Sequence, residues 1–279
     1  MSASALSAQR LGIGCWGALC PIANRQSQIP RVKLFLPYAY AIILRKSLVR
    51  STVQPMPISA ILFDLDNTLY PTSCGLFTQV QQRMNEYICT RLAVTPEEAA
   101  ALRARYFREH GTTMNGLMVV NRIDPHEFLD FVHDIDHSVV PANPELVTAL
   151  SALAGRKLIY TNGSVRHAEN LVAHLGIAHL FEDIFDIVAS GFAPKPAMAP
   201  FRAFVGRFGV EPRRALMVED MAKNLAPAAE LGMTTAWVRS SLDWAAAEAE
   251  SDYIHHVVDD LAGFLAAASA LRQGRKEER

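Results

Sequence analysis

The sequence contains few cysteines and almost no net charge, and each shortage excludes a class of protein. Its 279 residues include only four cysteines, whose spacings match neither a zinc site nor a disulfide framework. A reduced compartment is therefore expected, and we predict a cytoplasmic protein. The formal net charge is −1, so no overall field attracts nucleic acid or an anionic membrane. Small molecules are the expected partners.

Acidic residues are missing altogether before Asp64, although basic residues are present there. A basic, acid-free leader is typical of an organelle-targeting peptide. A membrane anchor is a second interpretation, but the apolar run over residues 34–44 is too short to cross about 30 Å of hydrocarbon. We favour a start codon placed too early, because Met56 directly precedes the first convincing strand. Residues 1–57 are expected to be unstructured.

Half of the residues are hydrophobic, which is ample for a sizeable core. From residue 58 onward, short apolar runs alternate with helical patterns such as those at 165–175 and 200–208. The runs are typical of parallel strands covered on both faces, and they lie at residues 58–63, 157–160, 184–189, 215–218 and 234–238. The alternation predicts an α/β fold with a doubly wound, Rossmann-like parallel sheet, whose ligands bind beyond the carboxyl ends of the strands.

Between residues 71 and 143 the pattern contains helices only. Residues 76–92 are one predicted helix, and Thr95 and Asp124 each precede a proline that suits the first position of another. We therefore predict a helical cap that can close over a site and exclude water. The predicted domains are a core at 58–70 and 144–265, the cap at 71–143 and a charged tail at 266–279.

The segment Asp64-Leu65-Asp66 follows the first predicted strand. Side chains two apart share a side of an extended segment, so Asp64 and Asp66 face the same space. Two neighbouring carboxylates repel each other, and a divalent cation between them relieves the repulsion. One carboxylate can attack phosphorus, while the other protonates the leaving oxygen and then activates water. Ordinary surface acids are the competing interpretation, which a strand leading directly into the motif disfavours.

Two further segments suit a phosphate group. Thr161-Asn162-Gly163 follows the second predicted strand, where a hydroxyl and main-chain N–H groups can hold phosphoryl oxygens, although such residues commonly form an ordinary turn. Lys195 stands between two prolines that stiffen the backbone around it. A fixed cation there can neutralise charge in a transition state, although a lone lysine is usually solvated.

Glu219 and Asp220 follow the fourth predicted strand. Asp220 would complete an oxygen-rich magnesium site with Asp64 and the main-chain carbonyl of Asp66. Glu219 and Asn224 would hold metal-bound water or orient the ligands. Capping of the next helix is the competing interpretation, and it is compatible with the metal role.

In their order and spacing, these four segments resemble the haloacid dehalogenase (HAD) superfamily over residues 58–261. The resemblance implies a Mg²⁺-dependent phosphomonoester hydrolase that acts through an aspartyl-phosphate. It assigns Asp64 as nucleophile and Asp66 as acid and base, and it assigns catalytic roles to Thr161 and Lys195. The implied metal ligands are Asp64, Asp66, Asp220 and Glu219. One departure is Asn224, where many members carry a second acid.

Shorter segments resemble the pyrimidine 5′-nucleotidase branch of that superfamily. They are DLDNTLYP at 64–71, HGTTMNGL at 110–117, FVHDIDH at 131–137, and TNG with RHA within 161–168. This resemblance implies hydrolysis of nucleoside 5′-monophosphates such as UMP and CMP, with loops at 111–117 reading the base. The implied substrate-binding residues are Asn67, Thr68, Asn162, Gly163, Arg166 and Thr113. At Arg166, an exposed arginine in the first turn of a helix is an equal alternative.

Several histidines invite other interpretations. His133 and His137 are four apart on a predicted helix, a spacing that suits a metal, but no third ligand is evident. We interpret them as a polar cap surface or as a wall near the substrate. His255 and His256 point apart on either periodicity, so we predict that they lie at the surface or at a sheet edge.

Rival functions stay open. Another phosphatase or a phosphomutase of the superfamily would keep the same groups, whereas a dehalogenase is disfavoured because that branch lacks the second aspartate, here Asp66. A catalytically weak binding or regulatory module predicts the loss of Asp64, Asp66, Lys195 or Asp220, and all four are present. Nucleic acid and membrane are not expected as partners, and we expect a monomer or a homodimer.

Overall fold

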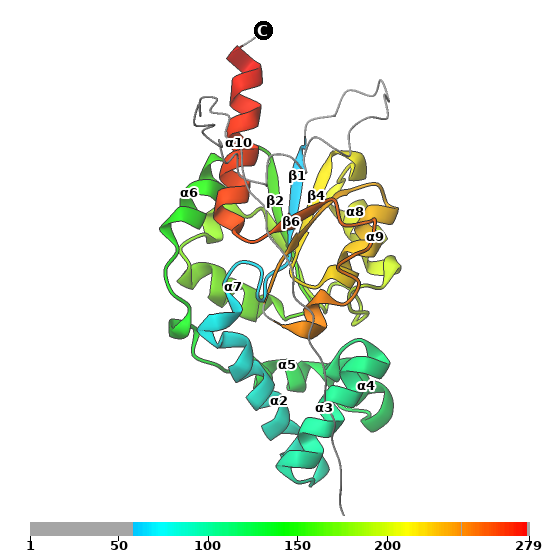
Figure 1. The fold of residues 1–279 in the computed structure, drawn as a ribbon. Coiled ribbons are helices and arrows are strands. Elements are labelled where there is room, and N and C mark those ends of the chain that lie inside the picture. The colour runs from blue at the N-terminus through cyan, green and yellow to red at the C-terminus, as the bar shows by residue number, and fades with distance from the viewer. Residues whose placement is uncertain (1–57, 241, 278–279) are drawn as a thin grey trace, which may run out of the picture. The chain divides into compact units, whose positions relative to one another are not determined.

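The computed structural model describes residues 58–240 and 242–277, apart from the side chains of residues 243 and 270–277. The predictions for residues 1–57 lie outside the described residues. The described chain contains a six-stranded parallel sheet in the order β3-β2-β1-β4-β5-β6, visible in Figure 1. Its strands are β1 (Ala60–Phe63), β2 (Arg156–Tyr160), β3 (Asp183–Phe185), β4 (Ala215–Glu219), β5 (Thr234–Val238) and β6 (His256–Val258). The sheet confirms the predicted doubly wound α/β fold.

Helices cover both faces of this sheet (Figure 1). One face carries α6 (Pro144–Ala152), α7 (Val165–His174) and α10 (Leu261–Glu277), and the other carries α8 (Met198–Phe208) and α9 (Ala226–Glu230). Alternation along β1 explains the two layers, because Ile61 and Phe63 pack with the first group of helices while Ala60 and Leu62 pack with the second. Fully burying a large apolar side chain contributes roughly 1.5–3 kcal/mol, so both layers stabilise the sheet.

Two strands differ from the sequence-based prediction. The run predicted at 184–189 is a strand only as far as Phe185, because Asp186 turns the chain. Its carboxylate accepts hydrogen bonds from the main-chain N–H groups of Val165 (2.9 Å) and Ala189 (2.8 Å). No apolar run predicts β6, a short edge strand whose first two residues are exposed. His256 begins this strand, at the sheet edge where it was expected.

Four helices follow β1 and lie beyond the carboxyl ends of the strands in Figure 1: α2 (Leu76–Leu92), α3 (Pro96–His110), α4 (Thr113–Asn121) and α5 (Pro125–Val132). Two of them begin as the sequence predicts. Thr95 forms a capping box at the start of α3, and the Asp124 side chain caps α5. We call these four helices the cap. Their buried faces form a separate hydrophobic cluster that includes Tyr106 and Phe128.

Most of the segment predicted as loops at 111–117 belongs to helix α4, so that prediction is wrong. The Thr112 side chain caps the helix, and Leu117 is buried. Gly116 allows a close approach to α3, because a Cβ atom at this position would lie 2.3 Å from Cγ of Tyr106. Packing against α3 therefore stabilises helix α4, which the local sequence did not predict.

Short 3₁₀ helices connect the main elements: η1 (Thr72–Cys74), η2 (His137–Val139), η3 (Ala178–Leu180), η4 (Pro212–Arg214), η5 (Ala222–Leu225) and η6 (Asp243–Ala246). Helix α5 ends at Val132, so the prediction that His133 and His137 lie on one helix is wrong. Helix α10 extends over most of the range predicted as a charged tail. Among the described residues, no helix has the length and apolar character needed to cross a membrane.

Candidate active site

The functional side chains follow the carboxyl ends of three neighbouring strands. Phe63, the last residue of β1, pairs with Ile159 on β2 and with Val218 on β4. Because the strands are parallel and in this register, Asp64, Thr161 and the pair Glu219-Asp220 emerge at the same edge of the sheet. Segments that lie far apart in the sequence therefore meet as predicted.

Lys195 lies at the centre of this edge with only 2% of its surface exposed. Its Nζ donates to Asp64 Oδ1 (2.6 Å), Glu219 Oε2 (2.5 Å) and the carbonyl oxygen of Tyr160 (2.9 Å). Burial alone would lower the pKa of Lys195, but the two carboxylates raise it above its ordinary value. Lys195 is therefore a fixed ammonium whose three donors are all used.

Asp64 is held at both of its carboxylate oxygens. Lys195 contacts Oδ1, and the hydroxyl of Thr68 donates to Oδ2 at 3.1 Å. Burial, followed by the charge of Glu219, raises the pKa of Asp64 to about 7, while Lys195 opposes the shift. Thr68, predicted to bind substrate, instead contacts the predicted nucleophile.

Asp64, Glu219 and Asp220 form a buried acidic cluster whose oxygens lie within 4.8 Å of one another. One ammonium cannot balance three carboxylates, so burial, and then the charges of Glu219 and Asp64, hold the pKa of Asp220 well above its usual range. Oδ2 of Asp220 is buried with no hydrogen-bond partner among the described residues. An unpartnered oxygen and an excess of negative charge fit a hard divalent cation such as Mg²⁺.

Glu219 mainly orients its neighbours. Its Oε2 accepts from Lys195, and its Oε1 accepts from the N–H of Met221 (3.2 Å) and from Nδ2 of Asn224 (3.1 Å). The amide of Asn224 can donate this hydrogen bond, which an ionised acid at the same position could not do. The asparagine at position 224, where many members of the resembling superfamily carry an acid, therefore helps to fix the side chain of Glu219.

Asp220→Asn is expected to change how stability depends on pH. Because the folded pKa of Asp220 is raised, the folded protein keeps a proton that the unfolded chain releases above about pH 4. As pH rises, ionisation of Asp220 in the unfolded chain therefore lowers the free energy of unfolding of the metal-free wild type. Asp220→Asn should not show this decrease. Urea unfolding in EDTA at about pH 5 and about pH 8 measures the difference. Parallel pH dependences, or equal stabilisation of both proteins by Mg²⁺, would contradict it.

Asp66 lies beside the cluster and is only partly buried. Its Oδ1 accepts from the Tyr70 hydroxyl (2.7 Å) and contacts Nε2 of His167 (2.8 Å). Burial alone would raise the pKa of Asp66, but His167 and Tyr70 together lower it to about 2. Asp66 is therefore ionised at neutral pH and can accept a proton.

The segment Thr161-Asn162-Gly163 is held by local hydrogen bonds. The Thr161 hydroxyl accepts the N–H of Gly163 (2.9 Å), and Asn162 Oδ1 accepts the N–H of Lys195 (2.9 Å). That N–H of Gly163 is thus already used, and Asn162 also fixes the backbone of Lys195. Asn162 and Gly163 line the cavity described next, whereas Thr161 is buried behind them.

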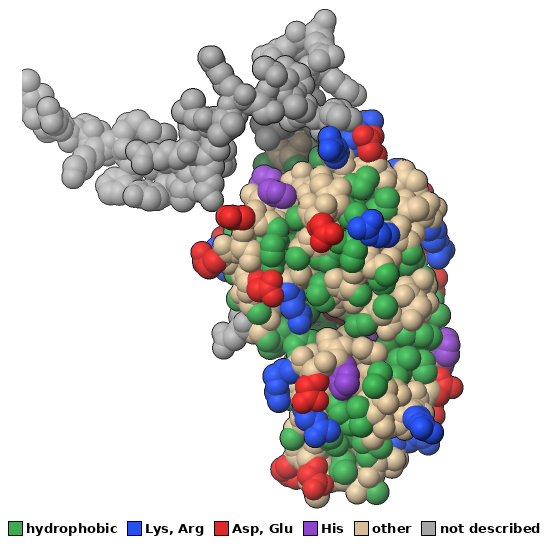
Figure 2. Space-filling model, turned by 90° about the vertical axis from the view of Figure 1, so that its right-hand side faces the viewer, with side chains coloured by type: hydrophobic (Ala, Val, Ile, Leu, Met, Phe, Trp, Pro, Cys, Tyr) green, Lys and Arg blue, Asp and Glu red, His purple; other side chains and the backbone are tan. Residues whose placement is uncertain are grey.

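A cavity of about 530 Å³ lies between this edge of the sheet and the cap. The face in Figure 2 shows a hollow where the two meet. Asp64, Asp66, Lys195 and Asp220 line the cavity on the core side. The aromatic residues Phe77 and Phe107 from the cap and Trp244 from η6 line it as well. The volume falls within the roughly 300–1,000 Å³ that is usual for small-molecule sites.

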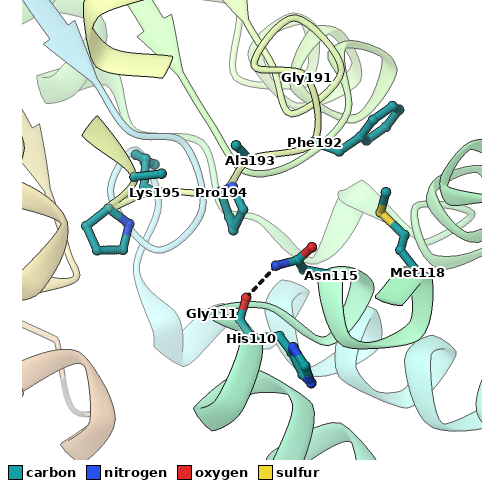
Figure 3. Close-up of a pocket in the computed structure, with 11 residues that line it drawn as sticks. His110, Gly111, Asn115, Met118, Gly191, Phe192, Ala193, Pro194 and Lys195 are labelled. Carbon is teal, nitrogen blue, oxygen red and sulfur yellow. Dashed lines mark hydrogen bonds between the residues drawn. The ribbon is translucent and has the colours of Figure 1, made fainter. Parts of the chain in front are cut away.

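A second cleft opens where the cap meets the segment that carries Lys195. His110, Gly111, Asn115 and Met118 face residues 191–197 across it, as Figure 3 shows. The Asn115 side chain donates to the carbonyl oxygen of His110 at 2.8 Å, which ties α4 to the end of α3. Gly111 and Lys195 line both spaces. The backbone next to Lys195 is therefore also a contact surface for the cap.

Of the remaining residues predicted to bind substrate, Asn67 and Thr113 line the cavity and Arg166 does not. Asn67 lines the cavity in a left-handed conformation (φ 61°), and its buried Oδ1 has no hydrogen-bond partner among the described residues. Thr113 lines the cavity, but its hydroxyl donates to the carbonyl oxygen of Arg103 at 3.4 Å. Arg166 lies outside the cavity lining, with 55% of its side chain exposed and an ion pair to Asp130 at 3.2 Å. Arg166 is therefore an exposed arginine in the first turn of a helix, which was the alternative to a substrate-binding role.

Sequence reasoning gave no role to Tyr70, His167 or Trp244. Tyr70 and His167 stand within the segments that resemble nucleotidases, but no spacing rule links His167 to an aspartate 101 residues earlier. Trp244 follows β5 and belongs to no motif. Only the folded chain brings these side chains to the site.

Comparisons with known proteins place this chain among phosphatases in sequence similarity and in fold. Glyceraldehyde 3-phosphate phosphatase of Methanothermobacter thermautotrophicus is 27% identical over 224 residues, which cover 73% of this chain and 96% of that protein. Phosphate metabolism protein 8 of Saccharomyces cerevisiae is 29% identical over 189 residues, and the match spans 61% of this chain but only 58% of the yeast protein. A solved HAD phosphatase from Thermococcus onnurineus shares the fold, with a TM-score of 0.52 and 18% identity over 77% of this chain and 96% of that one.

A family model supplies the assignment. The model for haloacid dehalogenase-like hydrolases matches residues 58–232, which contain β1, the cap and the strands that carry the site. Asp64, Asp66, Lys195 and Asp220 all lie within the matched range. The chain therefore belongs to the haloacid dehalogenase-like hydrolase family.

Proposed function

We propose that this protein is a Mg²⁺-dependent phosphatase that hydrolyses pyrimidine nucleoside 5′-monophosphates such as UMP and CMP. The observation that carries the proposal is the convergence of Asp64, Asp66, Lys195 and Asp220 on one wall of a cavity that the cap also lines. Asp64 is the nucleophile, because both of its oxygens are fixed and it faces this cavity.

The reaction has two steps. In the first, Asp64 forms a bond to phosphorus while the bond from phosphorus to the 5′ oxygen breaks, and Asp66 protonates that oxygen. In the second, water attacks the aspartyl-phosphate and Asp66 accepts its proton, which releases inorganic phosphate and regenerates Asp64. The low pKa keeps Asp66 ionised in the free protein, the form that accepts a proton from water in the second step. The negative charge of a bound phosphate has to raise this pKa before Asp66 can donate a proton in the first step. Lys195 stabilises negative charge in both steps.

The same residues would hold the metal. Asp64, Asp220 and the main-chain carbonyl of Asp66 would bind Mg²⁺, which when bound acts as a Lewis acid toward a phosphoryl oxygen. Glu219 would keep Lys195 and Asn224 in place around it. Asn162 would contact the phosphoryl group, and Thr161, buried behind it, would hold the backbone of Gly163 in place.

The shape and chemistry of the cavity support a planar leaving group. Phe77 and Phe107 contact Trp244 with ring centroids 6.3 and 5.6 Å apart, so aromatic rings from the cap and from η6 lie together in the cavity lining. A nucleobase can stack on such rings. The guanidinium of Arg103, which also lines the cavity, can donate to a carbonyl oxygen of a pyrimidine. The choice of pyrimidines rests on the cap segments that resemble the nucleotidase branch.

A smaller substrate is the second candidate. The relative from Methanothermobacter thermautotrophicus is named for glyceraldehyde 3-phosphate, and almost its whole length matches this chain. A phosphorylated three-carbon compound would use the same phosphate-binding groups, but it has no planar group to stack on the aromatic rings. A phosphomutase would also use these groups but would return the phosphoryl group to an organic acceptor.

Phosphate release from a panel of compounds tests these candidates. UMP, CMP, AMP, glyceraldehyde 3-phosphate and phosphoglycolate are incubated with the full-length protein in Mg²⁺ and in EDTA. We expect Mg²⁺-dependent release that favours UMP and CMP. Trp244→Ala is expected to raise the KM for UMP roughly tenfold through lost stacking of about 1–3 kcal/mol, with little change for glyceraldehyde 3-phosphate. Preference for the three-carbon compounds would overturn the pyrimidine assignment and leave the phosphatase chemistry in place.

A further inference from the structure

The carboxylate of Asp66 is held asymmetrically. Both of its hydrogen bonds to described residues end on Oδ1, one from the Tyr70 hydroxyl and one from Nε2 of His167. Oδ2 faces Gly163, where an added Cβ atom would lie 3.6 Å from it. Since Asp66 and Gly163 both line the cavity, Oδ2 is the oxygen left to exchange a proton with bound substrate or water.

His167 is itself fixed on the core side. It lies in the first turn of α7, and its side chain is completely buried. Its main-chain N–H donates to the hydroxyl of Ser164, the residue that caps α7. A carboxylate oxygen can only accept a hydrogen bond, so the Nε2 atom of His167 carries a proton directed at Asp66.

Two histidines from beyond the cap helices complete the support of His167. The ring of His133, just after α5, stacks on the His167 ring with centroids 4.4 Å apart and an interplanar angle of 7°. His133 Nδ1 lies 2.9 Å from the Ser164 hydroxyl, which can donate to it. Nε2 of His137, at the start of η2, lies 3.4 Å from Nδ1 of His167.

We propose that His167 is a positioning residue that directs Oδ2 of Asp66 at the leaving oxygen, and that His133 and His137 hold the ring of His167 in place. The inference rests on the proposed phosphatase function. This role accounts for the contact of a fully buried histidine with Oδ1 of Asp66 and for the contacts of His133 and His137 with that histidine.

A positioning role makes a specific kinetic prediction. A poor leaving group such as a nucleoside 5′ oxygen requires protonation, whereas p-nitrophenolate leaves without it, and general acid catalysis is worth about 10²–10⁴-fold. His167→Ala is therefore expected to reduce kcat/KM for UMP, or for the best panel substrate, by on the order of 10²-fold. The value of kcat/KM for p-nitrophenyl phosphate should change less than about threefold, because this parameter excludes the second step.

Matched variants separate positioning from loss of structure. His167→Gln keeps an amide donor near the former Nε2 and should recover much of the lost kcat/KM for UMP. His174→Ala removes another α7 histidine, which contacts the carbonyl oxygen of Val140 at 2.8 Å, and should leave the ratio of the two substrates unchanged. His133→Ala should shift this ratio in the same direction as His167→Ala.

The outcomes distinguish this inference from the function on which it rests. If His167→Ala reduced kcat/KM equally for UMP and p-nitrophenyl phosphate, or reduced neither, the positioning role would be overturned while the phosphatase activity stands. A wild-type protein that hydrolyses neither substrate would instead overturn the proposed function. In that case a crystal structure of His167→Ala decides the inference, since an Asp66 carboxylate with unchanged orientation would contradict it.

Discussion

Asp64→Asn is expected to reduce phosphate release by roughly 10³-fold or more, because an amide cannot attack phosphorus to form the covalent intermediate. The folded structure should survive, since the substitution removes one charge from a buried cluster that holds three carboxylates and one ammonium. Initial rates with UMP in Mg²⁺, together with thermal unfolding, measure both effects.

A surface carboxylate provides the matched control for this substitution. Asp130 pairs with Arg166 outside the cavity, and its side chain is 73% exposed. Asp130→Asn makes the same chemical change and should keep wild-type rates, because exposed ion pairs contribute only about 0–1 kcal/mol. If Asp64→Asn kept more than a tenth of the wild-type rate, Asp64 would not be the nucleophile.

Lys195→Met is expected to lower stability by about 3–5 kcal/mol and to abolish activity. Asp64 and Glu219 would lose their shared cation while staying buried, so their repulsion would no longer be offset. Protonation of the carboxylates relieves part of this cost at low pH. The destabilisation should therefore grow as pH rises from about 5 to about 8. Mg²⁺ should recover part of the lost stability, and urea unfolding measures each term.

Lys157→Met is the control for burial of a lysine. Lys157 is also buried, but its Nζ donates only to the carbonyl oxygen of Leu153 (2.7 Å), at the other end of the sheet. Its removal should destabilise the protein by roughly 1–3 kcal/mol, without a response to Mg²⁺. Equal losses in the two variants, or an equal response to Mg²⁺, would show that the acidic cluster does not depend on Lys195 for charge balance.

Most of the core of the site could be predicted from the sequence because Asp64, Thr161 and the pair Glu219-Asp220 lie at the ends of strands. Short apolar runs end at Asp64, Thr161 and Glu219, and parallel strands bring such ends to one edge. Lys195 was predicted from its prolines and the family resemblance, and it lies where both require. Local pattern was sufficient for Asp64, Thr161 and Glu219 because the position of each depends on its own strand.

Other parts of the site depend on packing between distant segments. Helix α4 forms against Tyr106, Arg166 turns outward to Asp130, and His133 stacks on His167 from a position just after α5. None of these contacts has a period or a spacing in the sequence, because each joins separate elements. By itself, then, the sequence determined the α/β class, the cap and the charged groups of the reaction. Tertiary structure alone decided which oxygen of Asp66 faces the cavity, since Tyr70 and His167 hold the other one. It also decided which aromatic rings line the cavity, since that depends on how the cap packs against the sheet.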